Sequence, residues 1–483
     1  MICPESPSDQ GGEDINATVE STSLLPQKKN QMQPSDKSVL TPEERLQISF
    51  FLKVSVLSPE ERLKLSSLLK AMESKEQALR NLDPMVLDLS IREPAVGSPI
   101  GHVLENKLAL LSLARKFGFK EILLATFNVS MPEIEQVDDA FCKLLNERKE
   151  DLTGTFGFAS PGKFSADQKV FNADISMEKL KKYKIPNAIF DLDITKAYVR
   201  VEDRDNYLRE LAATIKWTHE NIRGDNGGAP RVYINYQDGV DAFFEDWEWV
   251  ARVTKFLATQ PIAAILYEDG KGTALPFQIA TLTAMIKGLM PPNIKLLVHM
   301  HAGNGMENAS IMEALLNGAD GIWAGFTREA ATNGHAPSSE LLANLRRLGN
   351  QIVEKKYAFK QMVPIAHEMT KINTGEQTQP DVPIIGRNAY RTIHTFFMQD
   401  KNQKMDLAPE AIGAKPGWRI TMSSDNAVLR NRLNEVRPGT ELDDATANRM
   451  RALLRSDLMA GKRIAYDEPN NLIDLYVRAT TKP

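Results

Sequence analysis

Short apolar runs with the alternation of β-strands recur from residue 86 onwards, and segments with the 3.6-residue period of helices separate them. Residues 103–118 and 276–289 are two of these helical segments. Eight strands that alternate with helices predict an α/β fold of the (β/α)8, or TIM barrel, type. A doubly wound open sheet is the alternative, but its nucleotide-binding form needs a Gly-x-Gly-x-x-Gly turn, which follows none of the early strands. The predicted strands are residues 86–93, 121–127, 152–158, 187–194, 231–237, 263–269, 295–301 and 321–326.

The N-terminal segments differ from the predicted barrel in composition. Residues 1–38 are rich in Ser, Pro, Gln, Asp and Gly, which predicts a disordered tail. In the next segment, 39–80, stretches of the form Ser/Thr-Pro-Glu-Glu begin at Thr41 and Ser58. Each stretch offers a capping residue, a proline for the first turn and a glutamate that completes a capping box. We therefore expect a helical extension made of two short helices paired as a hairpin.

The rhythm of strands and helices ends near residue 357, so the barrel is predicted to span 81–357. Residues 358–385 include a polar stretch that is typical of a linker. Arg-rich patterns of helical period follow. We therefore expect a small C-terminal subdomain, either helical or α/β, over residues 386–483.

Composition narrows the class of protein further. Lys and Arg number 59 and Asp and Glu 63, so the net charge of -4 provides no basic field for nucleic acid or an anionic membrane. No run of about 18 apolar residues occurs, so no membrane span is expected. Only Cys3 and Cys142 are present, which excludes a disulfide framework and favours a reducing compartment. We expect a cytoplasmic protein with no nucleic-acid or membrane partner.

Two histidines, His299 and His301, end the predicted seventh strand. Side chains alternate along a strand, so both rings should face the same way at the end of the barrel where TIM-barrel enzymes place their catalytic groups. Glu93 ends the first predicted strand nearby, and Asn333 in the loop after the eighth could add an amide oxygen. Such ligands suit a divalent ion, with zinc, manganese, magnesium and iron all compatible. The alternative is that the histidines finish an ordinary strand, but their position and the nearby carboxylate favour metal.

Other charged residues lie at the same predicted strand ends. Arg92 has the planar geometry to bind a substrate carboxylate or an enolate oxygen, although a buried ion pair is the structural alternative. Glu268 and Asp269 end the sixth strand, where acids either bind substrate or cap the next helix. The sequence does not choose between these two roles.

Several stretches resemble signatures of the DRE-TIM metallolyase superfamily. "LDLSIREPAVGSP" resembles the motif Asp-x-x-x-Arg-[Asp/Glu]-Gly-x-Gln of its first strand, with Asp88, Arg92 and Glu93 in place. "VHMHAGNG" is similar to its His-x-His motif, and "GFTREAATNG" to a glycine-rich segment in which Glu329 and Asn333 keep the informative positions. The resemblance continues into the linker and subdomain of 2-isopropylmalate and homocitrate synthases, and a glutamate ligand points to the homocitrate branch.

The resemblance implies an acyltransferase that binds a divalent metal and condenses acetyl-CoA, or another acyl-CoA, with a small 2-oxo acid. It implies catalytic roles for Arg92, which would stabilise the enolate, and for Glu329. His394 is the nearest counterpart of a histidine that acts in the partner subunit's site, which implies a homodimer with exchanged C-terminal subdomains. The substrate-binding residues it implies, besides Arg92, are Tyr233, which replaces an arginine that binds the distal carboxylate, and Asp269, which is kept from a turn motif.

This sequence also departs from the family's pattern. Pro94 and Val96 stand where Gly and Gln are expected, and Gly270 replaces a threonine. Leu123 replaces an acid, and Ala302 begins a dipeptide that replaces Asn-Asp. An altered pocket leaves two other functions open: a metal-dependent carbon-carbon lyase or aldolase without CoA, or a binding or regulatory protein that has lost catalysis.

Overall fold

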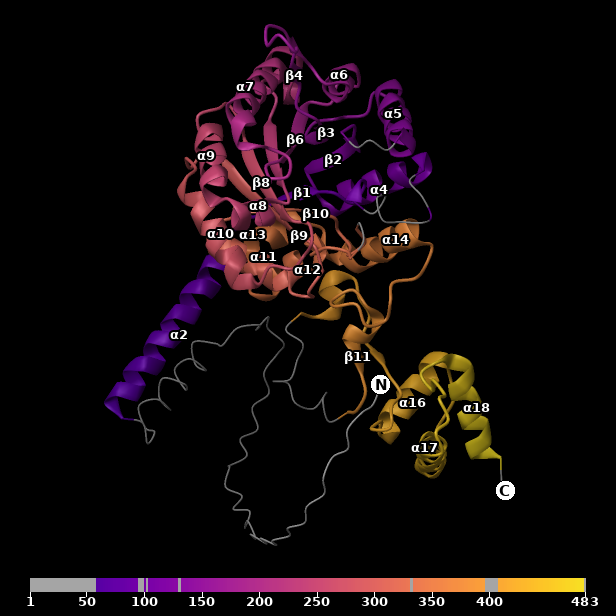
Figure 1. Cartoon of the computed structure of the whole chain (residues 1–483). Helices are drawn as coiled ribbons and strands as arrows, with labels where there is room; N and C mark the ends of the chain where they lie inside the picture. Colours follow the sequence, from indigo (N-terminus) through magenta and orange to yellow (C-terminus); the bar gives the residue numbers. More distant parts are fainter. Residues whose placement is uncertain are drawn as a thin grey trace, which may run out of the picture. The chain divides into compact units, whose positions relative to one another are not determined.

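The computed structural model describes residues 58–93, 100, 103–128, 132–330, 333–395 and 407–481. Eight parallel strands close into a barrel that helices surround (Figure 1), so the predicted TIM barrel is confirmed. In order around the barrel, the strands are β1 (Met85–Asp88), β10 (Gly321–Ala324), β9 (Lys295–Met300), β8 (Ala264–Asp269), β7 (Val232–Gln237), β6 (Asn187–Asp193), β3 (Thr155–Ala159) and β2 (Glu121–Thr126). The helices between and after them are α4 (Leu104–Phe117), α5 (Pro132–Glu147), α6 (Ile175–Lys182), α7 (Arg204–Asn221), α8 (Gly239–Glu245), α9 (Trp247–Leu257), α10 (Pro276–Gly288), α11 (Glu307–Leu316) and α12 (Ser338–Arg347).

Alternation along the strands divides the core into two layers. One layer fills the barrel interior and includes Leu123, Phe156, Leu297 and Trp323, all essentially inaccessible to solvent. The residues between them face outward and pack against the helices. The apolar side chains inside the barrel determine which alternate residues of each strand face inward. They therefore also determine which residues face inward at the mouth.

The first strand is shorter than the sequence predicts. It ends at Asp88, which pairs with Ala324, and the N–H groups of Arg92 and Glu93 both donate to the carbonyl of Leu89. Arg92 and Glu93 therefore lie in a turn beyond the strand and not on it. The turn carries both side chains over the mouth of the barrel.

The helical extension contains one long helix within the described residues. Helix α2 (Pro59–Arg80) has 22 residues, so the prediction of a short helix is wrong here. Its capping box is as predicted: Ser58 N donates to Glu61 Oε2 at 2.7 Å, and Glu61 N donates to Ser58 Oγ at 3.3 Å. The first predicted helix, the hairpin and the disordered tail 1–38 lie outside the described residues.

Packing on the barrel continues past residue 357. Helix α14 (Met362–Thr374) lies inside the predicted linker, and its residues Met362, Ile365 and Met369 belong to the main core. A separate apolar cluster joins the last three helices, which agrees with a helical C-terminal subdomain, and the subdomain itself stays a prediction. The remaining elements are α13 (Gln351–Lys356), α16 (Asn426–Val436), α17 (Asp444–Met459), α18 (Pro469–Thr480), the antiparallel pair β4 (Lys163–Phe164) and β5 (Phe171–Asn172), and the parallel pair β11 (Arg391–Thr392) and β12 (Gly417–Trp418). None of the helices described here is both long and apolar enough to cross a membrane.

Candidate functional site

Glu93, His299 and His301 meet at the mouth of the barrel. Each offers one ligand atom, and these atoms all lie within 4.8 Å of one another. Nε2 of His299 lies 3.1 Å from Nε2 of His301, which in turn lies 3.9 Å from Oε1 of Glu93. All three side chains are buried. The predicted convergence of these residues is therefore present in the structure.

The hydrogen bonds of the two histidines suit a metal site. Nδ1 of His299 lies 2.7 Å from the carbonyl oxygen of Trp323, to which it can only donate, and this tautomer leaves a lone pair on Nε2. Nδ1 of His301 is buried and has no hydrogen-bond partner among the described residues. Two nitrogens that bind one ion at about 2.1 Å and at right angles lie about 3 Å apart, close to the observed separation. The donor set of two nitrogens and one oxygen therefore fits a divalent cation.

Arg92 and Glu93 form an ion pair beside the histidines. The guanidinium Nη1 contacts Oε2 of Glu93, and its Nε donates to Oγ1 of Thr126 at 3.2 Å. Burial by itself would raise the pKa of Glu93, but Arg92 and the neighbouring imidazoles lower it to about 2. Glu93 is therefore a carboxylate at neutral pH, with Oε1 on the side of the histidines. The ion pair that the sequence left as an alternative role for Arg92 is present.

Two further acids, Glu268 and Asp191, lie near the cluster. The sequence left the role of Glu268 open and did not single out Asp191. Glu268 is the inward residue at the end of β8, because Ala264 and Leu266 of the same parity lie inside the barrel. Burial, together with the charges of Asp191 and Glu93, raises the pKa of Glu268 to about 8. Asp191 of β6 accepts hydrogen bonds from two amides, and burial raises its pKa as well. Glu268 is thus a buried carboxyl group whose protonated form is favoured by its surroundings.

His335 is a third buried histidine that the sequence did not single out. Its ring stacks on that of His299 with centroids 5.3 Å apart, and burial lowers its pKa to about 4. Its Nε2 accepts a hydrogen bond from the N–H of Gly325 at 2.8 Å, so this nitrogen is not available to a metal ion. His335 therefore supports the ring of His299 and is not a ligand through Nε2.

The glycines after His301 serve close packing between two loops. A Cβ on Gly303 would lie 2.1 Å from the carbonyl oxygen of Lys271, and one on Gly272 would lie 2.3 Å from that of His301. Gly272 also has a φ of +64°, which other residues rarely adopt. The loops after β8 and β9 thus approach each other through their backbones, which fixes the chain directly beyond the histidines.

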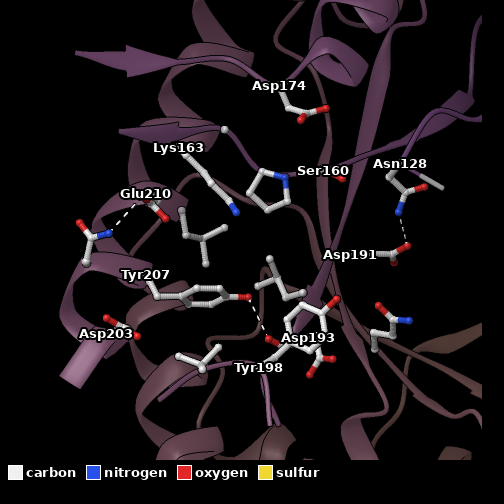
Figure 2. A pocket seen from close by; sticks show the side chains of 17 residues that line it. Asn128, Ser160, Lys163, Asp174, Asp191, Asp193, Tyr198, Asp203, Tyr207 and Glu210 are labelled. Carbon is white, nitrogen blue, oxygen red and sulfur yellow. Dashed lines mark hydrogen bonds between the residues drawn. The ribbon is translucent and has the colours of Figure 1, made fainter. Parts of the chain in front are cut away.

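A cavity of about 600 Å³ opens beside the barrel mouth (Figure 2). It lies between the end of β6, the loop at residues 160–163 and helix α7. Asn128 and Asp191 line it, and Asp191 also acts electrostatically on Arg92. Asp191 therefore lies in the wall of the cavity and also interacts electrostatically with Arg92 and Glu93, beside the cluster.

Asp269 has a structural role in the loop after β8. Its two carboxylate oxygens accept hydrogen bonds from the backbone N–H groups of Gly272, at 2.9 Å, and Ala274, at 2.8 Å. Its parity is opposite to that of Glu268, so it faces away from the interior. Asp269 therefore shapes the loop after β8, and its role in substrate binding stays a prediction.

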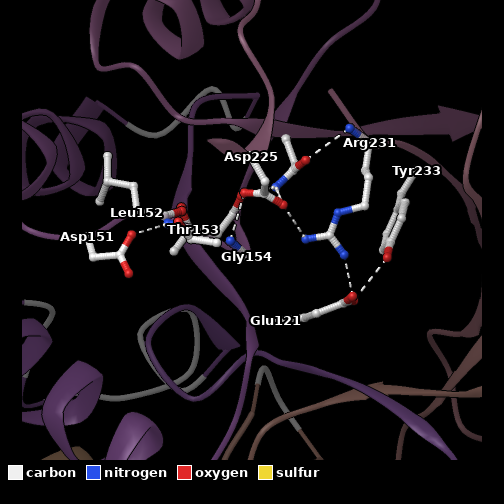
Figure 3. Close-up of polar contacts among 10 residues, drawn as sticks. Glu121, Asp151, Leu152, Thr153, Gly154, Asp225, Arg231 and Tyr233 are labelled. Atoms are coloured by element: carbon white, nitrogen blue, oxygen red, sulfur yellow. Dashed lines mark hydrogen bonds and ion pairs between the residues drawn. The ribbon is translucent and has the colours of Figure 1, made fainter. Parts of the chain in front are cut away.

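Tyr233, which is also predicted to bind substrate, has a structural contact at the other end of the barrel. It is the second residue of β7, and its hydroxyl donates to Oε2 of Glu121, the first residue of β2, at 2.9 Å (Figure 3). Arg231 contacts the other oxygen of Glu121 and pairs with Asp225 at 2.9 Å. This network lies at the N-terminal end of the barrel, opposite the mouth, where polar residues serve stability.

Replacing Tyr233 by phenylalanine is therefore expected to affect stability and not substrate binding. Loss of the hydrogen bond to the Glu121 carboxylate should lower the free energy of unfolding by about 1–2 kcal/mol. Denaturant unfolding measures this change. A Tyr233→Phe protein with altered substrate binding, at unchanged stability, would contradict the structural role.

The structure does not test the remaining site predictions. Glu329 lies half-buried in the loop after β10, and its Oε2 is buried without a hydrogen-bond partner among the described residues. Asn333 is exposed, unlike the three buried residues of the cluster, which does not support a role as a ligand in this conformation. His394 pairs with Asp425 at 3.4 Å, so its action in a partner's site stays a prediction, as does the homodimer.

Comparisons with known proteins show distant similarity to two synthases. No protein-family model matches the chain. Methylthioalkylmalate synthase 1-1, chloroplastic, from Eutrema japonicum is 21% identical over 78% of this chain and 74% of its own length. A 2-isopropylmalate synthase from Olsenella uli is 27% identical over 42% of each chain, so the match spans less than half of that relative. An HMG-CoA lyase structure from Bacillus subtilis has a TM-score of 0.49 at 16% identity, covering 62% of this chain and 96% of its own, and this likeness is too slight to carry an inference. The likeness to the two synthases, with the motifs around Arg92 and His299, supports the resemblance to the DRE-TIM metallolyase superfamily, near the 2-isopropylmalate synthases.

Proposed function

We propose that the protein is a divalent-metal-dependent acyltransferase that condenses an acyl-CoA, with acetyl-CoA as the first candidate, with a small 2-oxo acid. The observation that carries the proposal is the convergence of Glu93, His299 and His301 beside Arg92 at the mouth of the barrel. The names of the curated relatives, 2-isopropylmalate synthase and methylthioalkylmalate synthase, support the reaction class.

Glu93, His299 and His301 would hold the ion. When bound, the ion would supply Lewis-acid polarisation of the ketone of the 2-oxo acid. Arg92 carries its positive charge beside the cluster and is 19% exposed, so its guanidinium can donate to an oxygen on which negative charge develops. Its bond to Thr126 and its position over the ring of Phe158 orient it.

The proposed reaction forms one carbon-carbon bond and cleaves one thioester. A base removes a proton from the carbon next to the thioester carbonyl, that carbon attacks the ketone carbon, and the ketone oxygen gains a proton. Water then cleaves the thioester to give a carboxylate and free CoA thiol. Glu268, with a pKa of about 8, can hold or accept one of the protons that move.

Release of free thiol tests the proposal. Metal-loaded protein is incubated with acetyl-CoA and, in turn, oxaloacetate, 2-oxoisovalerate, 2-oxoglutarate and pyruvate, with chelator-treated protein as the control. We expect thiol release that needs both the metal and one of the acids. No release with any acid would refute the acetyl-CoA form of the proposal, and release of pyruvate or an aldehyde from hydroxy-keto acids would identify a lyase instead.

Substitution of Glu268 by glutamine should lower kcat by about 10²-fold or more, because the amide cannot carry a proton. The metal content should stay unchanged, since Glu268 is not in the ligand cluster. Steady-state thiol release and elemental analysis measure the two quantities. Glu248→Gln, at an exposed acid in α9, is the matched control, and equal kcat in the two variants would remove Glu268 from the mechanism.

A further inference from the structure

The cavity beside the barrel mouth is strongly acidic. Five carboxylates line it, and Lys163 is the one basic side chain among its described lining residues. Asp203 is already paired with Arg200 at 3.0 Å, so its charge is partly compensated. The acids are Asp174, Asp191, Asp193, Asp203 and Glu210, and several are labelled in Figure 2.

Two of these carboxylates use only one oxygen to hold the surrounding chain. Oδ1 of Asp193 accepts from the N–H and the hydroxyl of Thr195, at 3.0 and 2.6 Å. Oε1 of Glu210 accepts from the N–H of Phe164 at 3.2 Å and from Asn206 at 3.1 Å. No hydrogen bond of the described residues uses the second oxygen of either acid, so both remain available as acceptors.

Two amides that bind Asp191 also present unused acceptors; Asn128 lines the cavity, and Asn235 does not. Asn128 and Asn235 each donate their NH2 group to Asp191, at 2.6 and 2.8 Å. These bonds fix the orientation of the amides, because a flipped amide would place its oxygen against the carboxylate. The oxygens of both amides are buried without a donor in the described part of the chain, and Asn235 is only 2% exposed. Buried acceptors without donors call for a ligand that brings N–H groups.

We propose that this cavity binds the cationic end, an amine or a guanidinium, of a small ligand. The inference rests on the proposed function in one respect: the ligand is then a 2-oxo acid whose keto-acid end lies at the Glu93, His299 and His301 cluster and whose far end reaches the cavity through Asn128 and Asp191. Carboxylates and amide oxygens match a donor-only group in charge and in hydrogen bonding. The same wall repels a second carboxylate and the phosphates of CoA, and an apolar chain placed against it would leave the carboxylates and the amide oxygens without donors.

Calorimetry with three ligands of similar length tests the proposal on metal-loaded, full-length protein. The probes are 5-guanidino-2-oxopentanoate, its neutral isostere 5-ureido-2-oxopentanoate and anionic 2-oxoadipate. The guanidino acid is expected to bind at least about tenfold more tightly than the neutral acid, and 2-oxoadipate most weakly. Equal or tighter binding of the neutral acid would overturn the proposal.

Isosteric variants locate the effect. Glu210→Gln and Asp193→Asn each keep the oxygen that binds the backbone and remove one charge, so both should fold normally and lose most of the tenfold preference. Glu202→Gln removes a charge from an exposed neighbour that does not line the cavity, and should keep the preference. A preference that survives in both cavity variants would contradict the assignment. Thermal melts of all three variants check that they fold.

The outcome is separate from that of the acyl transfer, because calorimetry requires no turnover. If thiol release fails with every acid while the guanidino acid still binds preferentially, the proposed reaction falls and the cavity assignment stands. If thiol release occurs with 2-oxoisovalerate and no cationic preference is found, the reaction stands and the cavity assignment falls.

Discussion

Replacing His299 by alanine is expected to remove the bound metal and to lower kcat by about 10³-fold or more. Several kcal/mol of charge stabilisation go with the ion, and each 1.4 kcal/mol is a factor of about ten. His299 is the ligand whose tautomer the protein fixes, through Trp323, and its Nε2 lies 3.1 Å from that of His301. Elemental analysis after gel filtration measures the metal, and thiol release measures kcat.

The control for this prediction is His219→Ala. His219 lies in the last turn of helix α7, and its Nε2 lies within hydrogen-bond distance of the carbonyl oxygen of Pro261. The variant therefore loses a histidine that is not at the barrel mouth. It should keep both metal and activity. A His299→Ala protein that retains stoichiometric metal would place the ion elsewhere, and the proposed function would lose its central residue. The metal measurement holds whichever substrate proves to be the right one.

The convergence of Glu93, His299 and His301 could be predicted because it depends on two simple geometric rules. The period of two along a strand puts His299 and His301 on one face. Closure of the barrel leaves only β10 between β9 and β1, so the ends of these two strands lie near each other. The prediction for Glu93 survived an error in its strand. The turn after Asp88 returns the chain over the mouth, so a residue expected at the end of a longer strand still faces the histidines.

The predicted substrate contacts, Asp269 and Tyr233, took no account of depth in the barrel or of which face of the strand a residue occupies. Asp269 follows Glu268 directly, and the interior position of Leu266 on the same strand already indicates that Glu268 is the inward acid. Tyr233 is inward but near the start of β7, and Asn235, two residues later, is the side chain of that strand that reaches Asp191. Counting from the apolar interior positions towards the strand end would have identified Glu268, Asp191 and Asn235 from the sequence.

His335 could not be found in this way. It lies in the loop after β10, and its bridge to His301 and its stacking on His299 depend on how that loop folds back. No period in the sequence encodes such a return. The orientation of Arg92 is of the same kind, since its partner Thr126 is 34 residues away on β2.

Replacing Lys107 by methionine is expected to lower the free energy of unfolding by about 3–5 kcal/mol. Lys107 of α4 and Asp138 of α5 form an ion pair in which both side chains are about 1% exposed, and removal of one partner leaves a buried charge uncompensated. Lys107 also donates to the carbonyl of Leu124 at 3.1 Å. Denaturant unfolding measures the change. Lys143→Met, in an exposed pair with Glu147, is the matched control and should cost under about 0.5 kcal/mol.

A second substitution separates the buried charge from lost packing. Asp138→Asn keeps an oxygen for the N–H of Thr126, which the carboxylate accepts at 2.7 Å, but removes the charge. In the Lys107→Met background, Asp138→Asn should therefore restore at least about 1 kcal/mol of the free energy of unfolding. A double variant less stable than Lys107→Met would show that lost packing causes most of the destabilisation. Thr126 links this pair to the site, because its hydroxyl accepts from Arg92. Loss of the pair should consequently lower kcat under conditions where the variant is still folded, and removal of the uncompensated charge by Asp138→Asn should recover part of that loss.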